Sequence, residues 1–107
     1  MKRLALALVC AAIFAMAGCS RDEPETLSEE YPGEWRSDVP LDIKRALVSH
    51  GAKNCGYIEY KQRFDSIVQC LVYCSNDRKR WTAYVVWRGT DKVAGPFEQP
   101  SELQPPQ

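Results

Sequence analysis

The sequence has very little histidine, no surplus of charge of either sign and no hydrophobic run long enough to span a membrane. Of its 107 residues one is His, and 14 basic residues balance 14 acidic ones. A single imidazole excludes sites that need two and argues against Ser-His and zinc-His chemistry. Charge neutrality argues against a general nucleic-acid binder, which needs an excess of Lys and Arg. The length allows one small domain.

The longest apolar run lies close to the N-terminus. Leu4 to Ala17 carries no charge and follows the basic pair Lys2-Arg3. As a helix this run would extend about 21 Å at a rise of about 1.5 Å per residue, which is short of a bilayer core of about 30 Å. A basic start, an apolar centre and small residues at the end are typical of a secretory signal peptide.

The end of this run carries a more specific motif. Met16-Ala17-Gly18-Cys19 resembles the lipobox of bacterial lipoproteins, in which the signal peptide is removed just before a Cys that receives lipid. Ala17 and Gly18 fit a peptidase that needs small residues beside the cut, whereas Met16 is less common than Leu at the first position. The resemblance covers only the first 20 residues. It implies a signal peptide over residues 1–18 and a lipid anchor on Cys19.

The resemblance also implies a location. Cys19 would carry a diacylglyceryl group and an amide-linked acyl chain such as palmitate, and two or more chains give a stable membrane anchor. Ser20 follows Cys19, whereas Asp is the usual retention signal of the class for the inner membrane. We therefore expect attachment to the outer membrane, facing the periplasm. The alternative is an ordinary signal peptide in which Cys19 is incidental.

Composition divides the remaining chain into three segments. Residues 19–38 are predicted to be the lipidated Cys and an acidic tether, because residues 20–38 hold seven acidic residues against two basic ones and few aliphatic side chains. Within this tether, Tyr31 to Trp35 is expected to dock on the domain, since it carries two aromatic residues. Residues 39–98 are predicted to form a small α+β domain. The Pro/Gln-rich tail 99–107 is expected to be disordered.

The predicted fold class is α+β, with one N-terminal helix packed on a three- to four-stranded antiparallel meander that is stapled by a disulfide. A helix is predicted over 40–50, because its apolar positions form one stripe and Gly51 provides a stop, with Ser37 or Asp38 nearby for capping. Strands are predicted over 56–62, 66–74 and 80–88, with a short edge strand at 93–94 that Gly95-Pro96 ends. The helical stripe consists of Val39, Ile43, Ala46 and Leu47.

The third strand alternates, so its two faces can be assigned separately. We expect Trp81, Ala83, Val85 and Trp87 to face the helix, because Ala83 between two Trp residues leaves room for it. Tyr84 would then lie on the opposite face, together with Tyr57. A single helix would leave that face uncovered, which would make it a candidate surface for a partner.

Three cysteines remain after the signal peptide and the anchor: Cys55, Cys70 and Cys74. Cys70 and Cys74 are four positions apart on one strand, about 13 Å, which is too far for a disulfide or for one zinc ion. If the first hairpin turns near Phe64-Asp65, Cys55 comes opposite Tyr73 or Cys74. The predicted disulfide is Cys55–Cys74, with Cys55–Cys70 as the alternative.

The densest basic cluster, Arg78-Lys79-Arg80-Trp81, is placed at a hairpin tip. With Arg63, Tyr84 and Arg88 it would form a cationic, aromatic patch for anionic glycan, lipid A phosphate or an acidic protein. The alternative interpretation is a solvated turn whose charges protect a sheet edge from aggregation. The predicted binding residues are Arg78, Lys79, Arg80, Trp81, Tyr84 and Arg88.

No arrangement of residues typical of catalysis is present. His50 falls at the predicted helix end, the acidic residues of the domain fall mostly on turns, and the glycines form no phosphate loop. We therefore expect no enzyme, no cofactor, no metal and no nucleic acid. The predicted function is that of an envelope lipoprotein held to the membrane through Cys19, which binds an envelope protein as an inhibitor, immunity or exclusion factor. The alternative is a structural accessory subunit of a secretion or assembly complex.

Overall fold

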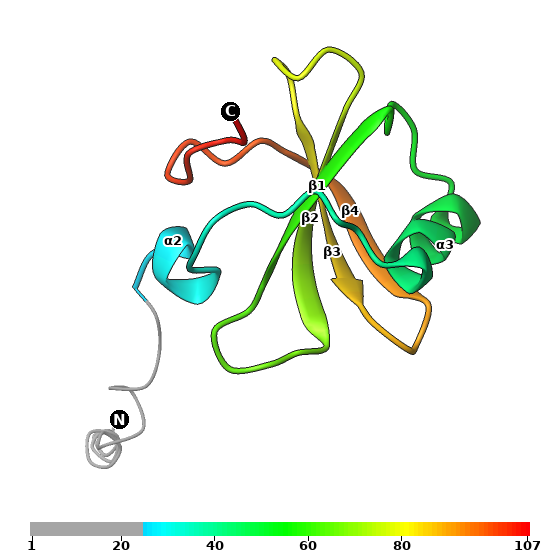
Figure 1. Ribbon diagram of the computed structural model, residues 1–107, viewed down its shortest axis with the longest axis horizontal. Helices are drawn as coiled ribbons and strands as arrows, with labels where there is room; N and C mark the ends of the chain where they lie inside the picture. Colours follow the sequence, from blue (N-terminus) through cyan, green and yellow to red (C-terminus); the bar gives the residue numbers. More distant parts are fainter. Residues whose placement is uncertain (1–24) are drawn as a thin grey trace, which may run out of the picture.

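The computed structural model describes residues 25–107 as one four-stranded antiparallel sheet with two short helices. The strands follow one another in space as they do in the chain, which makes the sheet a meander (Figure 1). The predicted signal peptide and Cys19 lie outside the described residues. No helix within residues 25–107 is both long and apolar enough to span a bilayer. The elements are α2 (Leu27–Glu30), α3 (Leu41–His50), β1 (Tyr57–Gln62), β2 (Gln69–Ser75), β3 (Thr82–Trp87) and β4 (Lys92–Glu98).

Helix α3 confirms the helix predicted over 40–50. It ends at Gly51, whose φ of 86° is the left-handed conformation that glycine adopts without a steric penalty. Its stripe Ile43, Ala46 and Leu47 is buried against the sheet, with Val39 packed beside it. The expected cap is wrong. Pro40 occupies the N-cap position without a side-chain hydrogen bond, because Asp38 pairs with Arg36 at 2.9 Å instead.

The hairpin between β1 and β2 turns later than the sequence suggested. Tyr57 lies opposite Ser75 and Gln62 opposite Cys70, so residues 63–68 form a loop of six residues instead of a tight turn at Phe64-Asp65. The loop is closed by its own hydrogen bonds, among them Arg63 N to Gln69 O at 2.9 Å. The predicted register was therefore wrong, although the order of the strands was right.

Strand β4 is longer than the predicted edge strand at 93–94. The chain continues through Gly95-Pro96 to Glu98, with a bulge in the pairing between Ala83 and Val85. Gly95 has a φ of 123°, and a Cβ built there would lie 2.9 Å from Ala83 O and from a ring carbon of Tyr84. Glycine therefore lets the strand pass close to β3 at a position where the sequence suggested a stop. Pro96 is accommodated because β4 is an edge strand.

The face of the sheet that α3 covers carries Tyr60, Cys70, Val72, Tyr84 and Val86, all buried. The predicted orientation of β3 was therefore reversed. Trp81, Ala83 and Val85 belong to a second cluster on the opposite face, whereas Tyr84 packs towards the helix. Alternation along β3 shows which side chains share a face. Because both faces of β3 are apolar, it does not show which face meets the helix.

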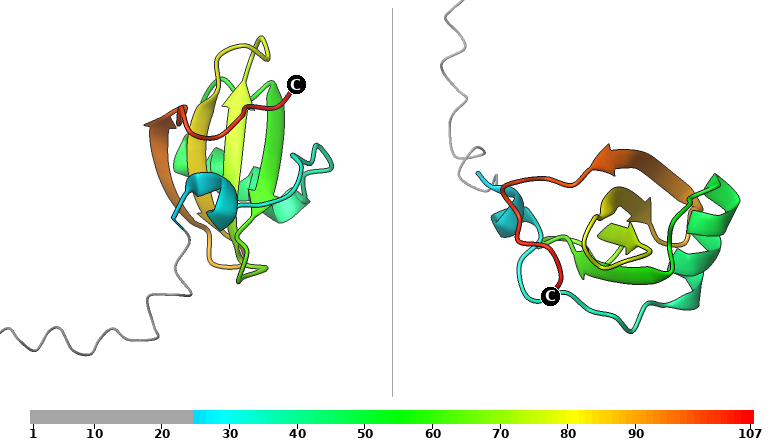
Figure 2. Two further views of the ribbon diagram at one scale, coloured as in Figure 1. Left: turned by 90° about the vertical axis from the view of Figure 1, so that its left-hand side faces the viewer. Right: turned by 90° about the horizontal axis from the view of Figure 1, so that it is seen from above.

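The second face of the sheet is covered by the segments that precede and follow the predicted domain (Figure 2). Tyr31 is 2% exposed and Leu103 3% exposed, and both belong to one core cluster with Leu71 and Tyr73, against which Trp35 packs. The Trp35 indole donates to Gln104 O at 2.8 Å. The prediction that the segment from Tyr31 to Trp35 docks on the domain is therefore confirmed. The predictions of a disordered tail and of an uncovered sheet face are wrong. The folded unit includes much of the predicted tether and tail.

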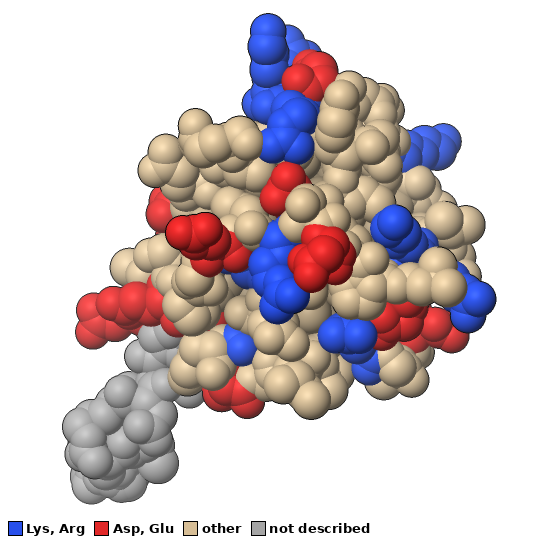
Figure 3. Space-filling model, viewed as in Figure 1, with Lys and Arg blue, Asp and Glu red and all other residues tan. Residues whose placement is uncertain are grey.

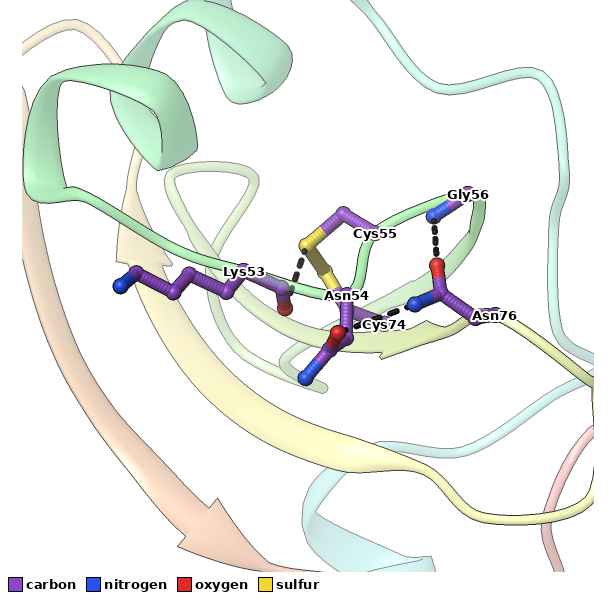
Figure 4. The surroundings of a disulfide bond; sticks show 6 residues. All are labelled: Lys53, Asn54, Cys55, Gly56, Cys74 and Asn76. Carbon is purple, nitrogen blue, oxygen red and sulfur yellow. Dashed lines mark hydrogen bonds between the residues drawn. A yellow bond between two sulfur atoms is a disulfide. The ribbon is translucent and has the colours of Figure 1, made fainter.

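The disulfide joins Cys55 to Cys74, as predicted (Figure 4). Cys70 is a buried free thiol. In the observed register Cys74 lies opposite Ile58, so Cys55 is not its partner across the ladder. Asn54, with a φ of 62°, turns the chain just before β1 and brings the two Cα atoms within 4.4 Å. Asn76 fastens the same corner, because it donates to Asn54 and accepts from Gly56 N at 3.1 Å.

We expect the variant Cys55→Ala/Cys74→Ala to lose about 3 kcal/mol of unfolding free energy, because the cross-link restricts the unfolded chain. Denaturant unfolding of the non-acylated domain measures the loss. The control Cys70→Ala keeps the cross-link and removes one buried sulfur atom. Mass spectrometry of non-reduced peptides that showed a Cys55–Cys70 link, or three free thiols, would contradict the pairing.

The hydroxyl of Tyr73 is the one buried side-chain polar atom of residues 25–107 without a hydrogen-bond partner. Burial raises the pKa of Tyr73 to about 12. Because Tyr73→Phe would break no hydrogen bond, we expect it to keep or raise the unfolding free energy. The matched variant Tyr31→Phe removes an acceptor 2.9 Å from the Gln69 amide and should cost about 1 kcal/mol. Equal losses in denaturant unfolding would refute this distinction.

Candidate interaction site at the β2–β3 tip

The loop between β2 and β3, residues 76–81, is held in shape by two side chains. Ser75 Oγ accepts from Arg78 N at 2.8 Å and donates to Asp77 Oδ1 at 3.0 Å. Asp77 Oδ1 also accepts from Lys79 N at 2.8 Å and Arg80 N at 3.1 Å. These hydrogen bonds lower the pKa of Asp77 from 3.8 to about 2, the backbone bonds from Arg80 and Lys79 contributing most. We call this loop the tip.

Arg78 turns inward from the tip and fastens it to the rest of the fold. Its φ of 61° is left-handed, and its guanidinium donates to Glu59 at 3.2 Å. The same group lies over the rings of Tyr57 and Trp81, 5.4 and 5.6 Å from their centroids. It also donates to the carbonyl of Gln107 at the end of the tail. Arg78 therefore has a structural role that sequence reasoning did not anticipate.

Lys79 and Arg80 are exposed at the tip. Within residues 25–107 neither side chain forms a hydrogen bond or an ion pair, whereas the backbone N–H of each is fixed by Asp77. Figure 3 shows basic side chains projecting from this end of the molecule, above the loop that joins β2 and β3. Two cations on an ordered loop can meet an acidic surface without the entropic cost of ordering the backbone on binding.

Two hollows have Glu59, the partner of Arg78, in their walls. One of about 440 Å³ lies between α3 and the start of β1, and includes Lys44, Tyr57, Glu59 and Arg78 in its wall. The other, of about 370 Å³, lies between the chain at Gly33–Trp35, β1 and the tail. It contains Lys61, which is 7% exposed. Glu59 lines both hollows, but it is 8% exposed and its carboxylate accepts from Arg78.

Lys61 is used internally. Its Nζ donates to Gly33 O at 2.7 Å and lies 5.1 Å from the centroid of the Trp35 ring. Burial lowers the pKa of Lys61, and Glu34 opposes that change. Because the ammonium group holds the segment around Trp35 against β1, Lys61 is a structural cation.

The structure does not bring all the predicted binding residues together. Arg78, Lys79, Arg80 and Trp81 share the tip, but Trp81 is 4% exposed and belongs to the second core cluster. Tyr84 is buried under α3. Arg88 lies at the other end of β3, paired with Asp42 at 2.9 Å. Arg63 lies in the loop after β1, paired with Glu30. The single patch that the sequence suggested is therefore reduced to Lys79 and Arg80, supported by Arg78.

Within residues 25–107, His50 and Cys70 carry an imidazole and a free thiol, two groups common in catalytic sites. His50 lies at the end of α3, with Nε2 2.9 Å from Gly95 O. The free thiol of Cys70 is fully buried, and burial raises its pKa, which keeps it in the less reactive protonated form. Residues 25–107 contain no group of three His, Cys, Asp or Glu side chains placed to hold a metal ion.

Comparisons with protein-family models, with curated proteins and with solved structures give no match to this chain. Its function is therefore inferred from the geometry of the tip and from the N-terminal motif.

We expect protonation of Asp77 to loosen the tip. Since the folded pKa of Asp77, about 2, lies below its ordinary value of 3.8, the carboxylate stabilises the tip above pH 4. That contribution is lost as the pH falls through about 2. The amide shifts of Lys79 and Arg80 in NMR spectra should follow this titration. In Asp77→Ala they should not titrate in this range. An unchanged titration in that variant would show that another group controls the tip.

Proposed function

We propose that the chain is a lipid-anchored envelope protein whose folded part acts by contact, with the tip as its interaction site. The observation that carries this proposal is the pair Lys79 and Arg80, exposed on a loop whose backbone Asp77 and Ser75 fix. The partner that this geometry fits is an acidic protein surface. The motif Met16-Ala17-Gly18-Cys19 supports an anchor on Cys19 in the outer membrane, facing the periplasm.

An inhibitor, immunity or exclusion role suits the site better than turnover does. The tip offers cations and a rigid backbone. The imidazole of His50, the single His, is hydrogen-bonded to Gly95 O, and the single free thiol in residues 25–107 is buried. Blocking another protein needs a stable contact surface and no reacting group. A cross-linked sheet with both faces covered provides such a rigid platform.

The experiment is purification of the full, C-terminally tagged chain from envelope extract, followed by identification of the proteins recovered with it. We expect Lys79→Ser/Arg80→Ser to lower recovery of the partner at least about tenfold, equivalent to about 1.4 kcal/mol. Arg45→Ser/Lys92→Ser removes the same charge from exposed positions on α3 and at the opposite end of the sheet, and should keep recovery.

Different recoveries separate the proposed roles. One soluble hydrolase in equal amount supports a blocking role, whereas several membrane subunits support the alternative role of an accessory subunit in an assembly. Equal recovery with both double variants would rule out the tip as the contact. The mass of the same purified protein tests the anchor, because a chain that still carries Gly18 before Cys19 would not be a lipoprotein.

A further inference from the structure

The end of the sheet opposite the tip exposes a group of large apolar side chains. Ile67 is 76% exposed, Leu41 59%, Phe64 45% and Val68 40%. These four make up most of the large hydrophobic residues exposed within residues 25–107. They lie in the loop after β1 and at the start of α3, and we call them the apolar end. The tip, at the other end of the sheet, contributes none of these four residues.

The apolar end is built from ordered backbone. In the loop after β1, Ser66 N donates to Arg63 O at 3.2 Å, and Ser66 Oγ accepts from Val68 N at 3.0 Å. Val68 O accepts from Arg88 N at 2.8 Å, which ties this loop to the one after β3. Arg88 in turn pairs with Asp42 at the start of α3. The exposed side chains therefore come from two elements, the loop after β1 and the start of α3, which are joined through Arg88.

The chain enters the folded unit beside this end. Phe64 N donates to Glu30 O at 2.8 Å, so the end of α2 contacts the loop. In Figure 1 and in the left view of Figure 2, α2 lies nearer to the loop after β1 than to the tip. Six residue steps separate Cys19 from Glu25, where the described chain begins, and they reach at most about 22 Å. A lipid on Cys19 would therefore hold the apolar end near the bilayer surface.

The two arginines that join the parts of the apolar end are both paired, whereas the Lys92 ammonium at the same end of the sheet lies over the Trp87 ring. Arg63 lies between Glu30 and Asp65, and Arg88 is bound by Asp42. These guanidinium groups are therefore not available to attract anionic lipid or an acidic protein. Apolar side chains beside paired guanidinium groups fit the boundary between headgroups and acyl chains.

We infer that the apolar end is a membrane-contact surface that inserts Phe64, Ile67 and Val68 into the lipid that holds Cys19. This inference rests on the proposed anchor. Contact at two points fixes the orientation of the domain, with the tip directed away from the bilayer. The interaction is hydrophobic, so it needs no anionic lipid and persists at high salt.

The test uses the full chain, processed in cells and reconstituted in phosphatidylcholine vesicles with or without brominated acyl chains. Ile67→Trp places a fluorescent reporter in the apolar end. Val48→Trp is a matched control on α3, because Val48 is 77% exposed and Ile67 76%. The parent chain corrects for Trp35, Trp81 and Trp87. We expect brominated lipid to remove about half of the added emission of Ile67→Trp, at low and high salt, because insertion reaches about 5–10 Å. The control should keep its emission.

The outcomes separate this inference from the proposed anchor. Mass spectrometry first shows whether Cys19 is acylated; an unacylated chain would overturn the anchor and this inference together. If the chain is acylated and floats with the vesicles, equal quenching of the two reporters would overturn the inference alone. An unquenched, blue-shifted Ile67→Trp signal with twice the monomer mass in detergent would show that a second copy covers the apolar end.

Discussion

Burial of β2 on both faces is the constraint on which the rest of the structure depends. Every residue from Cys70 to Ser75 is buried, so the sheet needs two covers. Helix α3 supplies one, with Ile43 and Leu47 at its centre. Residues 25–107 contain no second long helix, and the other cover is assembled from short segments on either side of the sheet-forming region. Because the second face needs this cover, Tyr31 and Leu103 are buried in one cluster with Tyr73.

The second cover is less apolar than the first, and charged groups lie where it ends. Lys61 lies beneath Trp35, and Glu59 lies beneath the guanidinium of Arg78. Burial of an unpaired charge is costly, so each needs its partner. Glu59 has Arg78, and Lys61 has the carbonyl of Gly33. Arg78 also donates to the carbonyl of Gln107, so one side chain contacts both β1 and the end of the tail.

Local signals in the sequence predicted the helix and the strands. The predictions that failed, the register and the disordered tail, depend on contacts between distant residues. The apolar stripe with Gly51 gave α3, and alternation gave the strands. The loop of six residues at 63–68 has no turn motif that fixes its length, so the register was missed. The tail has a composition typical of disorder, yet it is docked by the buried Leu103 and by hydrogen bonds to the carbonyls of Gln104 and Gln107.

The candidate site was predicted in part. A run of three basic residues in a short loop predicts cations at a hairpin tip. The structure places this run in the loop between β2 and β3. The sequence does not show that the left-handed backbone at Arg78 sends its side chain inward while Lys79 and Arg80 stay exposed. Grouping Tyr84 and Arg88 with the tip failed because β3 places Tyr84 on the α3 face and Arg88 at its far end.

The meander itself separates the two surfaces proposed for this protein. In an antiparallel meander the loops after the first and third strands lie at one end, and the loop after the second lies at the other. A strand of about six residues spans about 20 Å, so the tip and the apolar end are held apart by the length of the sheet. The chain enters beside the apolar end, through α2 and Glu30. An anchor placed there would display Lys79 and Arg80 at the greatest height that this fold allows. A fixed orientation would also reduce the rotational freedom lost when a partner binds.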